Sequence, residues 1–346
     1  MRINNKNCLD LIRGASLMTT GGGIPIADQL LSIKKLKNLK VKLQTLKDFP
    51  GDSFICLAAE LGPTDVPPLD KEKTIKKMLF ELERITNEKI SGIYPPEIGQ
   101  ESVVMEASHF LNLPVADFDP VGFRAVPYID INIFNLKGID VLYTPMVVST
   151  DKDEIFVLDS PLSYLKLEDA LRQMTQLSNR KSIFLLGAVL SIKNLVKHNI
   201  GSRSYSRALK LSRIKTINKL VEKLKPKLAI NAVIVDKKEV SVKGFFAEVV
   251  KFKNEKNKIF KMIVLNEILF IMDNKGKVLA SVPDKILLID SKRLCGLSTT
   301  NLSRNTKALI LVTDPEKEWR ISKAQKIFGR DRFKNLLREV KKYEKS

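Results

Sequence analysis

Histidine and cysteine are scarce in this sequence, and their scarcity excludes several kinds of site. The only two histidines are His109 and His198, so a metal centre built from several histidines is impossible. The three cysteines, Cys8, Cys56 and Cys295, lie far apart, are odd in number and have no C-x-x-C spacing. This pattern argues against a disulfide framework and against a cysteine-rich zinc site. None of the three has the electropositive surroundings of a nucleophilic thiol.

Long apolar runs are also missing. No run approaches the roughly 18 residues that are needed to cross a bilayer, and Asp10 and Arg13 interrupt the first apolar stretch, so a signal peptide is not expected. Neither the Walker pattern nor G-x-G-x-x-G occurs, so a nucleotide site is not supported. These absences favour a cytoplasmic protein without a membrane partner.

The sequence is strongly basic, with 59 Lys and Arg against 39 Asp and Glu and a formal charge of +20. Such a charge often accompanies nucleic-acid binding. Here the lysines have no interleaved aromatic residues and no recognisable binding motif, and they are scattered over residues 34–47, 71–77, 215–227, 251–261 and 341–345. A solvated lysine-rich surface is the favoured interpretation, and a nucleic acid or another anionic partner is the weaker one.

The chain is long enough for two domains. Its 346 residues exceed the size at which a single core usually keeps growing. A hydrophobic fraction of 44% and a mean hydropathy of -0.07 are typical of a globular protein.

Strand and helix patterns alternate in the first half. Apolar runs at residues 54–59, 92–94 and 115–117 predict strands of a mainly parallel sheet. A helix expected at residues 102–111 would join the last two as a right-handed crossover. Further strands are expected at residues 129–136, 138–148 and 154–160. The pattern predicts an N-terminal α/β domain over residues 1–162.

The second half, residues 163–346, has a different pattern. Helices are expected first, at residues 165–177, 182–197 and 206–224. From residue 228 to 312 the chain is rich in strand patterns separated by turns. We therefore expect a C-terminal domain in which helices lead into a β-sandwich or barrel.

Residues 91–128 carry most of the candidate catalytic groups. Glu97 follows the strand at 92–94, and Asp117 and Asp119 lie at the end of the next strand. Parallel strands end at the same edge of a sheet, which is where open α/β sheets bind ligands. We therefore expect these three carboxylates to meet there as catalytic groups. Arg124 is expected to bind an anionic group of a substrate.

Two further features are candidates for substrate binding. Gly21, Gly22 and Gly23 allow positive φ and close approach of a ligand to backbone N–H groups, although three glycines also suit a plain turn. Glu267 lies between Leu265 and Ile268, which are both apolar. A carboxylate that is buried in such a setting must be paired or ligated.

Several segments resemble the S-methyl thiohydantoin desulfurase family, long known as a hydantoinase-associated domain of unknown function. The main ones are PPEIGQES (residues 95–102) and VADFDPVGFRAVP (residues 115–127), which look like the acidic motif and the D-x-D-x-x-G-R-A-x-P motif of that family. Further segments that resemble the family are TTGGG (19–23), IGSRSYSRALKLSRI (200–214), KGF (243–245), LNE (265–267) and VPDKILLID (282–290). They keep the family order over nearly the whole chain.

The chain also departs from the family pattern. Gln100-Glu101-Ser102 stands where a glycine and an asparagine are usual, Phe123 interrupts a Gly-Arg pair, and Tyr128 replaces a carboxylate. The resemblance implies that the glycine loop lines the site. It also implies a small-molecule substrate, a thiohydantoin or related cyclic amide, with water attacking the ring carbon that bears sulfur.

Such hydrolysis needs a base for water and stabilisation of the negative charge that develops. A carboxylate of raised pKa can serve as the base, and a divalent metal held by Asp and Glu can supply both functions. Two functions stay open: a hydrolase-like enzyme, and a small-molecule-binding or regulatory subunit that keeps the fold without catalysis. The sequence decides neither the metal nor whether the chain forms a homo-oligomer.

Overall fold

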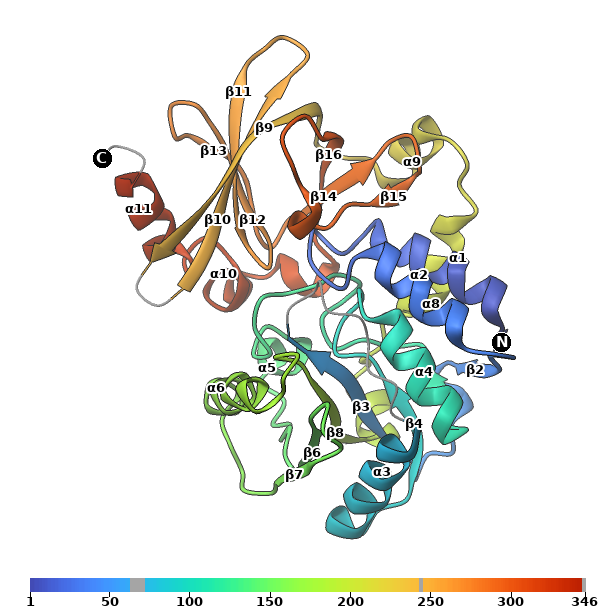
Figure 1. Cartoon of the computed structure of the whole chain (residues 1–346). Coiled ribbons are helices and arrows are strands. Elements are labelled where there is room, and N and C mark those ends of the chain that lie inside the picture. The colour runs from blue at the N-terminus through green and yellow to red at the C-terminus, as the bar shows by residue number, and fades with distance from the viewer. Residues whose placement is uncertain (63–71, 243–244, 344–346) are drawn as a thin grey trace.

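The computed structural model describes residues 1–62, 72–242 and 245–343 and contains two sheets, each flanked by helices (Figure 1). The first sheet lies in the lower part of the view, and the second lies in the upper part. Lys243 and Gly244, which carry part of the family resemblance, lie outside the described residues.

Eight strands form the first sheet, in the order β1-β2-β5-β4-β3-β8-β6-β7. Their bounds are β1 (Arg2–Ile3), β2 (Val41–Gln44), β3 (Phe54–Leu61), β4 (Ile90–Tyr94), β5 (Val115–Ala116), β6 (Met146–Ser149), β7 (Ile155–Leu158) and β8 (Ile183–Ser191). Strands β2, β5, β4 and β3 run parallel, and the strands at both edges are antiparallel to their neighbours. The expected parallel core of three strands is confirmed, within a sheet that is mixed as a whole.

Strand β3 contributes to two separate cores, because neighbouring side chains of a strand point to opposite faces. Cys56 and Ala58 pack with α1 (Asn5–Ser16), α2 (Ile26–Lys35), α3 (Glu72–Thr86) and α4 (Glu101–Leu111). Ile55 and Leu57 pack on the other face with α5 (Ile133–Lys137), α6 (Tyr164–Met174) and α7 (Ile192–Lys197). Both faces are covered, which explains why residues 54–59 are apolar without alternation.

Residues 182–197 do not form the expected helix. Ile183–Ser191 is strand β8, which pairs with β3 and β6, and only the six residues of α7 are helical. A short apolar run that is buried on both faces does not reveal its period. Gly187 permits the close pairing, since a Cβ there would lie 2.8 Å from the Cα of Met146. The first sheet therefore takes a strand from beyond residue 162, and the division of the chain at that residue stays a prediction.

The expected strand at residues 129–136 is also wrong. Residues Ile133–Lys137 form α5, whose first turn is capped by Asn132: its Oδ1 accepts a hydrogen bond from the N–H of Asn135 at 2.8 Å. Gly138, with a φ of 67°, ends the helix. Asparagine before a helix and glycine after it are ordinary helix signals, which the apolar alternation of this segment hides.

A second sheet of eight antiparallel strands follows, in the order β13-β12-β11-β10-β9-β16-β14-β15. The bounds are β9 (Leu228–Val242), β10 (Phe245–Asn254), β11 (Ile259–Leu265), β12 (Glu267–Asp273), β13 (Val278–Ser281), β14 (Lys285–Asp290), β15 (Cys295–Gly296) and β16 (Lys307–Thr313). Helices α8 (Ser204–Ser212) and α9 (Ile217–Leu224) precede it, as expected.

One face of the second sheet encloses a core of its own, which includes Ile234, Phe252 and Ile310. The other face packs against α10 (Ser322–Phe328) and α11 (Lys334–Tyr343). The β-rich second half is thus confirmed as an antiparallel sheet with helices, and its closure as a sandwich or barrel stays a prediction.

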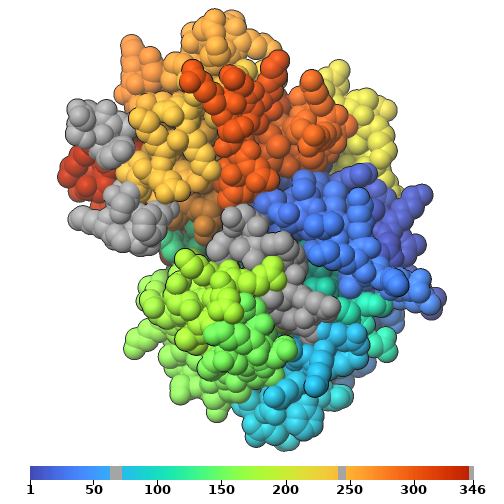
Figure 2. All heavy atoms as spheres, viewed as in Figure 1, coloured from blue at the N-terminus to red at the C-terminus, as the bar shows by residue number. Residues whose placement is uncertain are grey.

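The N-terminal helix joins the two halves. Gly14 of α1 lies directly against α8, where an added Cβ would be 1.8 Å from the carbonyl oxygen of Ala208. At the end of α1, the hydroxyl of Ser16 accepts a hydrogen bond from the N–H of Gly296 at 2.9 Å. Figure 2 shows the blue N-terminal helices against the orange strands of the second sheet.

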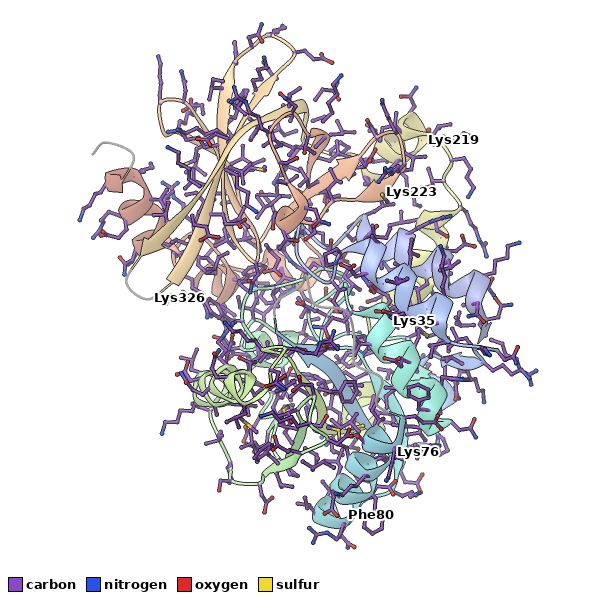
Figure 3. All side chains as sticks on the ribbon, in the orientation of Figure 1. Lys35, Lys76, Phe80, Lys219, Lys223 and Lys326 are labelled. Atoms are coloured by element: carbon purple, nitrogen blue, oxygen red, sulfur yellow. The ribbon has the colours of Figure 1, made fainter. Side chains whose placement is uncertain are left out.

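Exposed lysines lie on separate parts of the fold. Those labelled in Figure 3, Lys35, Lys76, Lys219, Lys223 and Lys326, are exposed residues of α2, α3, α9 and α10. A solvated lysine surface has this arrangement, and the absence of a nucleic-acid partner stays a prediction. Among the described helices, none is long and apolar enough to cross a membrane.

We predict that Gly14→Ala destabilises the protein by about 2–3 kcal/mol or more, because the new Cβ collides with the backbone of α8 and not with a side chain that can move. This loss exceeds the gain of about 1 kcal/mol that alanine brings to a helix interior. Denaturant unfolding measures the difference. Gly51→Ala is the matched control, since nothing lies within 4 Å of its Cβ position; equal stability of the two variants would contradict the close α1–α8 contact.

Candidate functional site

A cavity of about 530 Å³ lies where the carboxyl ends of β3 and β4 meet the second sheet. Its lining includes four glutamates: Glu60 at the end of β3, Glu97 after β4, Glu168 of α6 and Glu267 at the start of β12. Its volume is within the range of roughly 300–1,000 Å³ that is usual for small-molecule sites. The cavity also lies at the sheet edge where ligands of α/β proteins are expected.

Glu97 stands at the wall of this cavity, in the loop that the rigid Pro95-Pro96 pair begins. Its Oε2 accepts a hydrogen bond from the N–H of Val126 at 2.7 Å. Burial and the negative charge of Glu267 raise the pKa of Glu97 well above its ordinary value, although the hydrogen bond from Val126 opposes the increase. The carboxyl group therefore keeps its proton at a pH at which an exposed glutamate is ionised.

Glu267 reaches the same cavity from the second sheet. Its carboxyl group is buried, and its Oε2 has no hydrogen-bond partner among the described residues. Burial raises the pKa of Glu267 to about 8, while the positive charge of Arg124 opposes the increase. Gly22 leaves room for this side chain, since a Cβ there would lie 2.2 Å from Oε1 of Glu267.

The glycine loop holds Glu267 in place. Gly23 lines the cavity, and the carbonyl oxygen of Gly21 accepts a hydrogen bond from the N–H of Thr299 at 2.8 Å. The carbonyl oxygen of Thr20 accepts one from the N–H of Ile268 at 3.0 Å. The loop is therefore both a wall of the cavity and a link to the second sheet.

Asp117 is bound to a helix start and does not line the cavity. Its Oδ1 accepts hydrogen bonds from the N–H groups of Tyr205 and Ser206, at 2.9 and 3.1 Å, in the first turn of α8. The first N–H groups of a helix have no partner within it, and a carboxylate satisfies them and interacts favourably with the helix dipole. Asp117 therefore stabilises the start of α8 through these two hydrogen bonds.

Asp119 is enclosed by hydrogen-bond donors. Its Oδ1 accepts from the N–H groups of Val121 and Gly122 at 2.8 and 2.6 Å, and its Oδ2 accepts from that of Phe123 at 3.0 Å. The hydroxyl groups of Ser202 and Ser204 also donate to Oδ2. With five donors and a fully buried side chain, Asp119 shapes the loop after β5 and does not face the cavity.

Arg124 is buried between the two sheets. Its Nη1 donates to the carbonyl oxygen of Pro283 at 2.5 Å, and its guanidinium lies 4.3 Å from the ring centre of Phe328. Burial lowers the pKa of Arg124 to about 9, and the charge of Glu267 opposes the decrease. The positive charge of the guanidinium thus favours the ionised form of Glu267, although Arg124 does not line the cavity.

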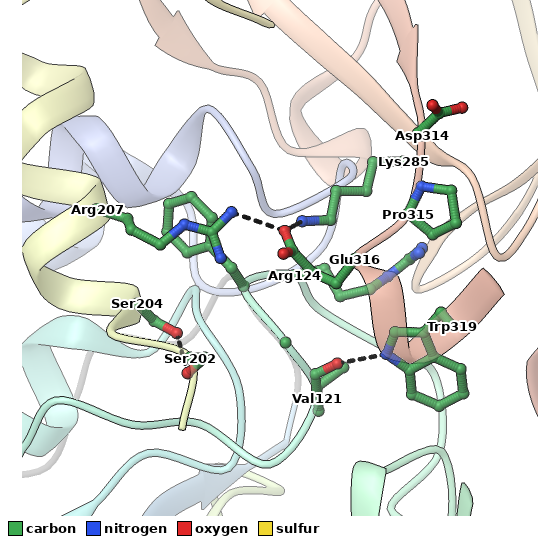
Figure 4. A network of polar contacts seen from close by, with 12 residues as sticks. Val121, Arg124, Ser202, Ser204, Arg207, Lys285, Asp314, Pro315, Glu316 and Trp319 are labelled. Carbon is green, nitrogen blue, oxygen red and sulfur yellow. Dashed lines mark hydrogen bonds and ion pairs between the residues drawn. The ribbon is translucent and has the colours of Figure 1, made fainter. Parts of the chain in front are cut away.

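A polar cluster holds the loop around Phe123 against the second half of the chain (Figure 4). Glu316 accepts from Arg207 at 2.7 Å and from Lys285 at 2.5 Å. Although burial opposes ionisation, Lys285 and Arg207 lower the pKa of Glu316 to about 2. The guanidinium of Arg207 lies 4.3 Å from the ring centre of Phe123, so the inserted aromatic residue is fixed by a cation.

Sequence reasoning therefore found part of this site and missed part of it. Of the eight residues expected there, Glu97, Gly23 and Glu267 line the cavity, and Gly21 and Gly22 stand directly behind it. The missed residues are Glu60 and Glu168 of the lining and the two serines that bind Asp119. Both serines lie in the segment 200–214 that carries the family resemblance, which was the available signal.

The described residues contain no group of three or more His, Cys, Asp or Glu side chains that is arranged to hold a metal ion. Glu101, which belongs to the altered motif, is buried behind the cavity, and burial raises its pKa to about 7. Its Oε1 accepts a hydrogen bond from the N–H of Gly99 at 2.8 Å, so this carboxyl group supports the loop that carries Glu97.

Fold and site together define a two-domain protein whose ligand cavity lies at the carboxyl edge of a parallel β-core. The chain belongs to the S-Me-THD-like family: the description "S-Me-THD-like, N-terminal domain" matches residues 6–160, and "S-Me-THD-like, C-terminal domain" matches residues 163–338. The resemblance to the S-methyl thiohydantoin desulfurase family is therefore confirmed.

A solved structure shares the fold. The crystal structure of a protein from Chromobacterium violaceum is 19% identical in sequence, covers 97% of each chain and has a TM-score of 0.79. No curated protein matches the chain.

We predict that Asp119→Asn lowers the free energy of unfolding by about 2–4 kcal/mol, because an amide donor replaces an acceptor among buried donors. The sequence alone predicts a much smaller effect for an exposed carboxylate. Denaturant unfolding measures the change in the free energy of unfolding, and Asp140→Asn, at an exposed position, is the control. Equal stability of Asp119→Asn and the parent would show that the five donors are not needed for the fold.

Proposed function

We propose that the protein is a hydrolase that acts on a thiohydantoin or a related cyclic amide. The observation that carries the proposal is the pair Glu97 and Glu267, which face one cavity from two different sheets. Membership of the S-Me-THD-like family supports the substrate class. A cytoplasmic location remains a prediction.

The two glutamates divide the acid and base work between them. Burial raises the pKa of both glutamates, and the negative charge of Glu267 raises that of Glu97 further. The positive charge of Arg124 favours the ionised form of Glu267, whereas the pKa of Glu97 lies well above its ordinary value. We assign the role of base to Glu267 and that of acid to Glu97, since pairs with separated pKa values suit such a division.

The reaction proceeds by substitution at the ring carbon. Glu267 takes a proton from water as its oxygen forms a bond to the ring carbon that bears sulfur, and the electrons of the C=N bond move to the ring nitrogen. The C–S bond then breaks, and sulfur leaves with the bonding electron pair and the proton that Glu97 provides. The proton on Glu267 passes to the ring nitrogen, and the new hydroxyl gives its proton to the ionised Glu97 as the C=O bond forms. The products are therefore a hydantoin and a thiol, and both glutamates return to their starting states.

The remaining expected residues have supporting roles in this proposal. Gly23 is the part of the glycine loop that can meet the substrate, and Gly22 accommodates Glu267. Asp117 and Asp119 fix α8 and the loop after β5. Arg124 adjusts the ionisation of Glu267 instead of binding an anionic group of the substrate.

We predict that Glu97→Gln lowers kcat/KM for an S-methyl thiohydantoin by about 10²–10⁴-fold, which is the usual contribution of a general acid. Binding of the hydantoin product should stay within a few-fold, because glutamine still accepts the hydrogen bond of Val126. Released thiol measures turnover, and calorimetry measures binding. Glu222→Gln on exposed α9 is the control.

The outcomes separate the two candidate functions. Unchanged turnover in Glu97→Gln would remove Glu97 from the mechanism. Hydantoin binding by the parent without turnover of any thiohydantoin would instead favour the binding or regulatory subunit.

We predict that kcat/KM of the parent increases with pH through the pKa of Glu267, about 8, because the base must be ionised. Arg124→Gln removes a positive charge that favours the ionised form, so the pKa of Glu267 rises and the increase moves to higher pH. Arg124→Lys keeps the charge and should stay closer to the parent. A pH profile of Arg124→Gln that is unchanged or moves to lower pH would disprove this role of Arg124.

A further inference from the structure

We infer that the substrate ring carries a bulky apolar substituent, of the size of a hydrophobic amino-acid side chain, which occupies the part of the cavity beneath α6. This inference rests on the proposed function and makes its substrate class more specific. It follows from the division of the cavity into a polar and an apolar end.

The polar end is defined by direct contacts. Glu97 is hydrogen-bonded to Val126, Glu267 packs on Gly22, and Gly23 packs on Gly99. These contacts gather the two carboxyl groups and the glycine loop at one place. A ring that reacts there has its leaving group and its attacking water within this end of the cavity.

The apolar end belongs to a continuous core. Leu57 of β3, Met146 of β6, Leu185 of β8, Leu171 of α6 and Tyr143 line the cavity and also belong to one buried hydrophobic cluster. They come from three neighbouring strands, one helix and the segment before β6. A ligand group that fills this end replaces water on an apolar surface, which is favourable.

The charges near the apolar end are satisfied within the protein. Arg172 donates to Glu168 Oε1 at 2.5 and 3.0 Å, and Glu168 Oε2 accepts from the N–H of Ile129 at 2.9 Å. Lys181 is exposed at the rim. The paired groups inside therefore do not require a charged substituent.

The volume leads to the same conclusion. A cavity of about 150 Å³ holds a benzene ring, so the 530 Å³ available here is more than one small ring can fill. A bare thiohydantoin at the polar end would leave the apolar end without a ligand group. A substituent of isobutyl or benzyl size would occupy it.

The experiment uses the full chain and four hydantoins that carry hydrogen, methyl, isobutyl or benzyl on the ring carbon next to the carbonyl group. We expect calorimetry to give a Kd at least about tenfold lower for benzyl than for hydrogen, which is the usual effect of burying a side chain of this size. The matching S-methyl thiohydantoins should follow the same order in kcat/KM. Equal affinity across the series would overturn the inference.

Two variants locate the substituent. Leu171→Trp fills the apolar end and should weaken benzylhydantoin at least about tenfold while leaving unsubstituted hydantoin within a few-fold. Leu165→Trp, at an exposed position of the same helix, is the control. Equal weakening of both ligands by Leu171→Trp would contradict the assignment, and the series measured on the parent decides the question if that variant does not fold.

Failure of this inference differs from failure of the proposed function. Size-dependent binding without any thiol release would remove the hydrolase proposal and keep the apolar chamber. Thiol release at rates that do not depend on the substituent would keep the hydrolase and remove the chamber. Absence of binding and turnover with every compound would overturn both.

Discussion

The hydrogen bonds to the Asp119 carboxylate are the constraint on which the site depends. Three backbone N–H groups of its own loop converge on this side chain with the hydroxyls of Ser202, which precedes α8, and Ser204, which begins it. An ionised carboxylate is costly to bury unless it is satisfied by donors. The five donors offset that cost only when both segments are in place, so the loop and the start of α8 order each other.

The geometry of the loop determines what its other residues can reach. The carbonyl oxygen of Val121 accepts a hydrogen bond from the indole of Trp319 at 2.6 Å, and Arg124 binds the carbonyl oxygen of Pro283. Two residues further along, the N–H of Val126 binds Glu97. The loop that Asp119 orders therefore connects the first sheet, the second sheet and the wall of the cavity that carries Glu97.

The ionisation of the proposed catalytic pair depends on the contact between the two halves. Glu97 follows β4 of the first sheet, and Glu267 begins β12 of the second. Burial and mutual repulsion raise the pKa of Glu97 only when both halves enclose the cavity. Separation of the halves would expose each carboxyl group and return it towards ordinary acidity. The raised pKa of Glu97 is therefore a property of the assembled chain and of neither half alone.

The sequence predicts features that depend on local order. The run 54–59 identifies a strand that is covered on both faces, and the position of Glu97 after β4 places it at a sheet edge. The sequence also places Asp117 and Asp119 at that edge, and in the structure both residues follow the end of β5. It does not tell which donors they meet, because Ser202, Ser204 and the first turn of α8 come from far along the chain. Strand β8 was not predicted for a related reason. Its conformation depends on pairing with β3 and β6, which are distant in the sequence.

The departures from the family motif lie mostly in packing positions. Gln100 accepts a hydrogen bond from the N–H of Glu60 at 2.9 Å, and the N–H of Ser102 donates to Gln29 at 3.0 Å. Phe123 packs under Arg207. None of these contacts removes either member of the Glu97 and Glu267 pair, so the altered residues do not by themselves argue against catalysis.

Tyr128, like Gln100, lines the cavity, and it is the departure that changes a charge. Burial raises its pKa to about 12, so the phenol is neutral where the family commonly has a carboxylate. The guanidinium of Arg332 lies 5.0 Å from its ring centre, on the side of α11. Loss of one negative charge, together with the gain of an aromatic ring, makes this wall of the cavity less polar. On the function that we propose, the replacement suits a neutral ring with an apolar substituent and leaves Glu97 and Glu267 in place.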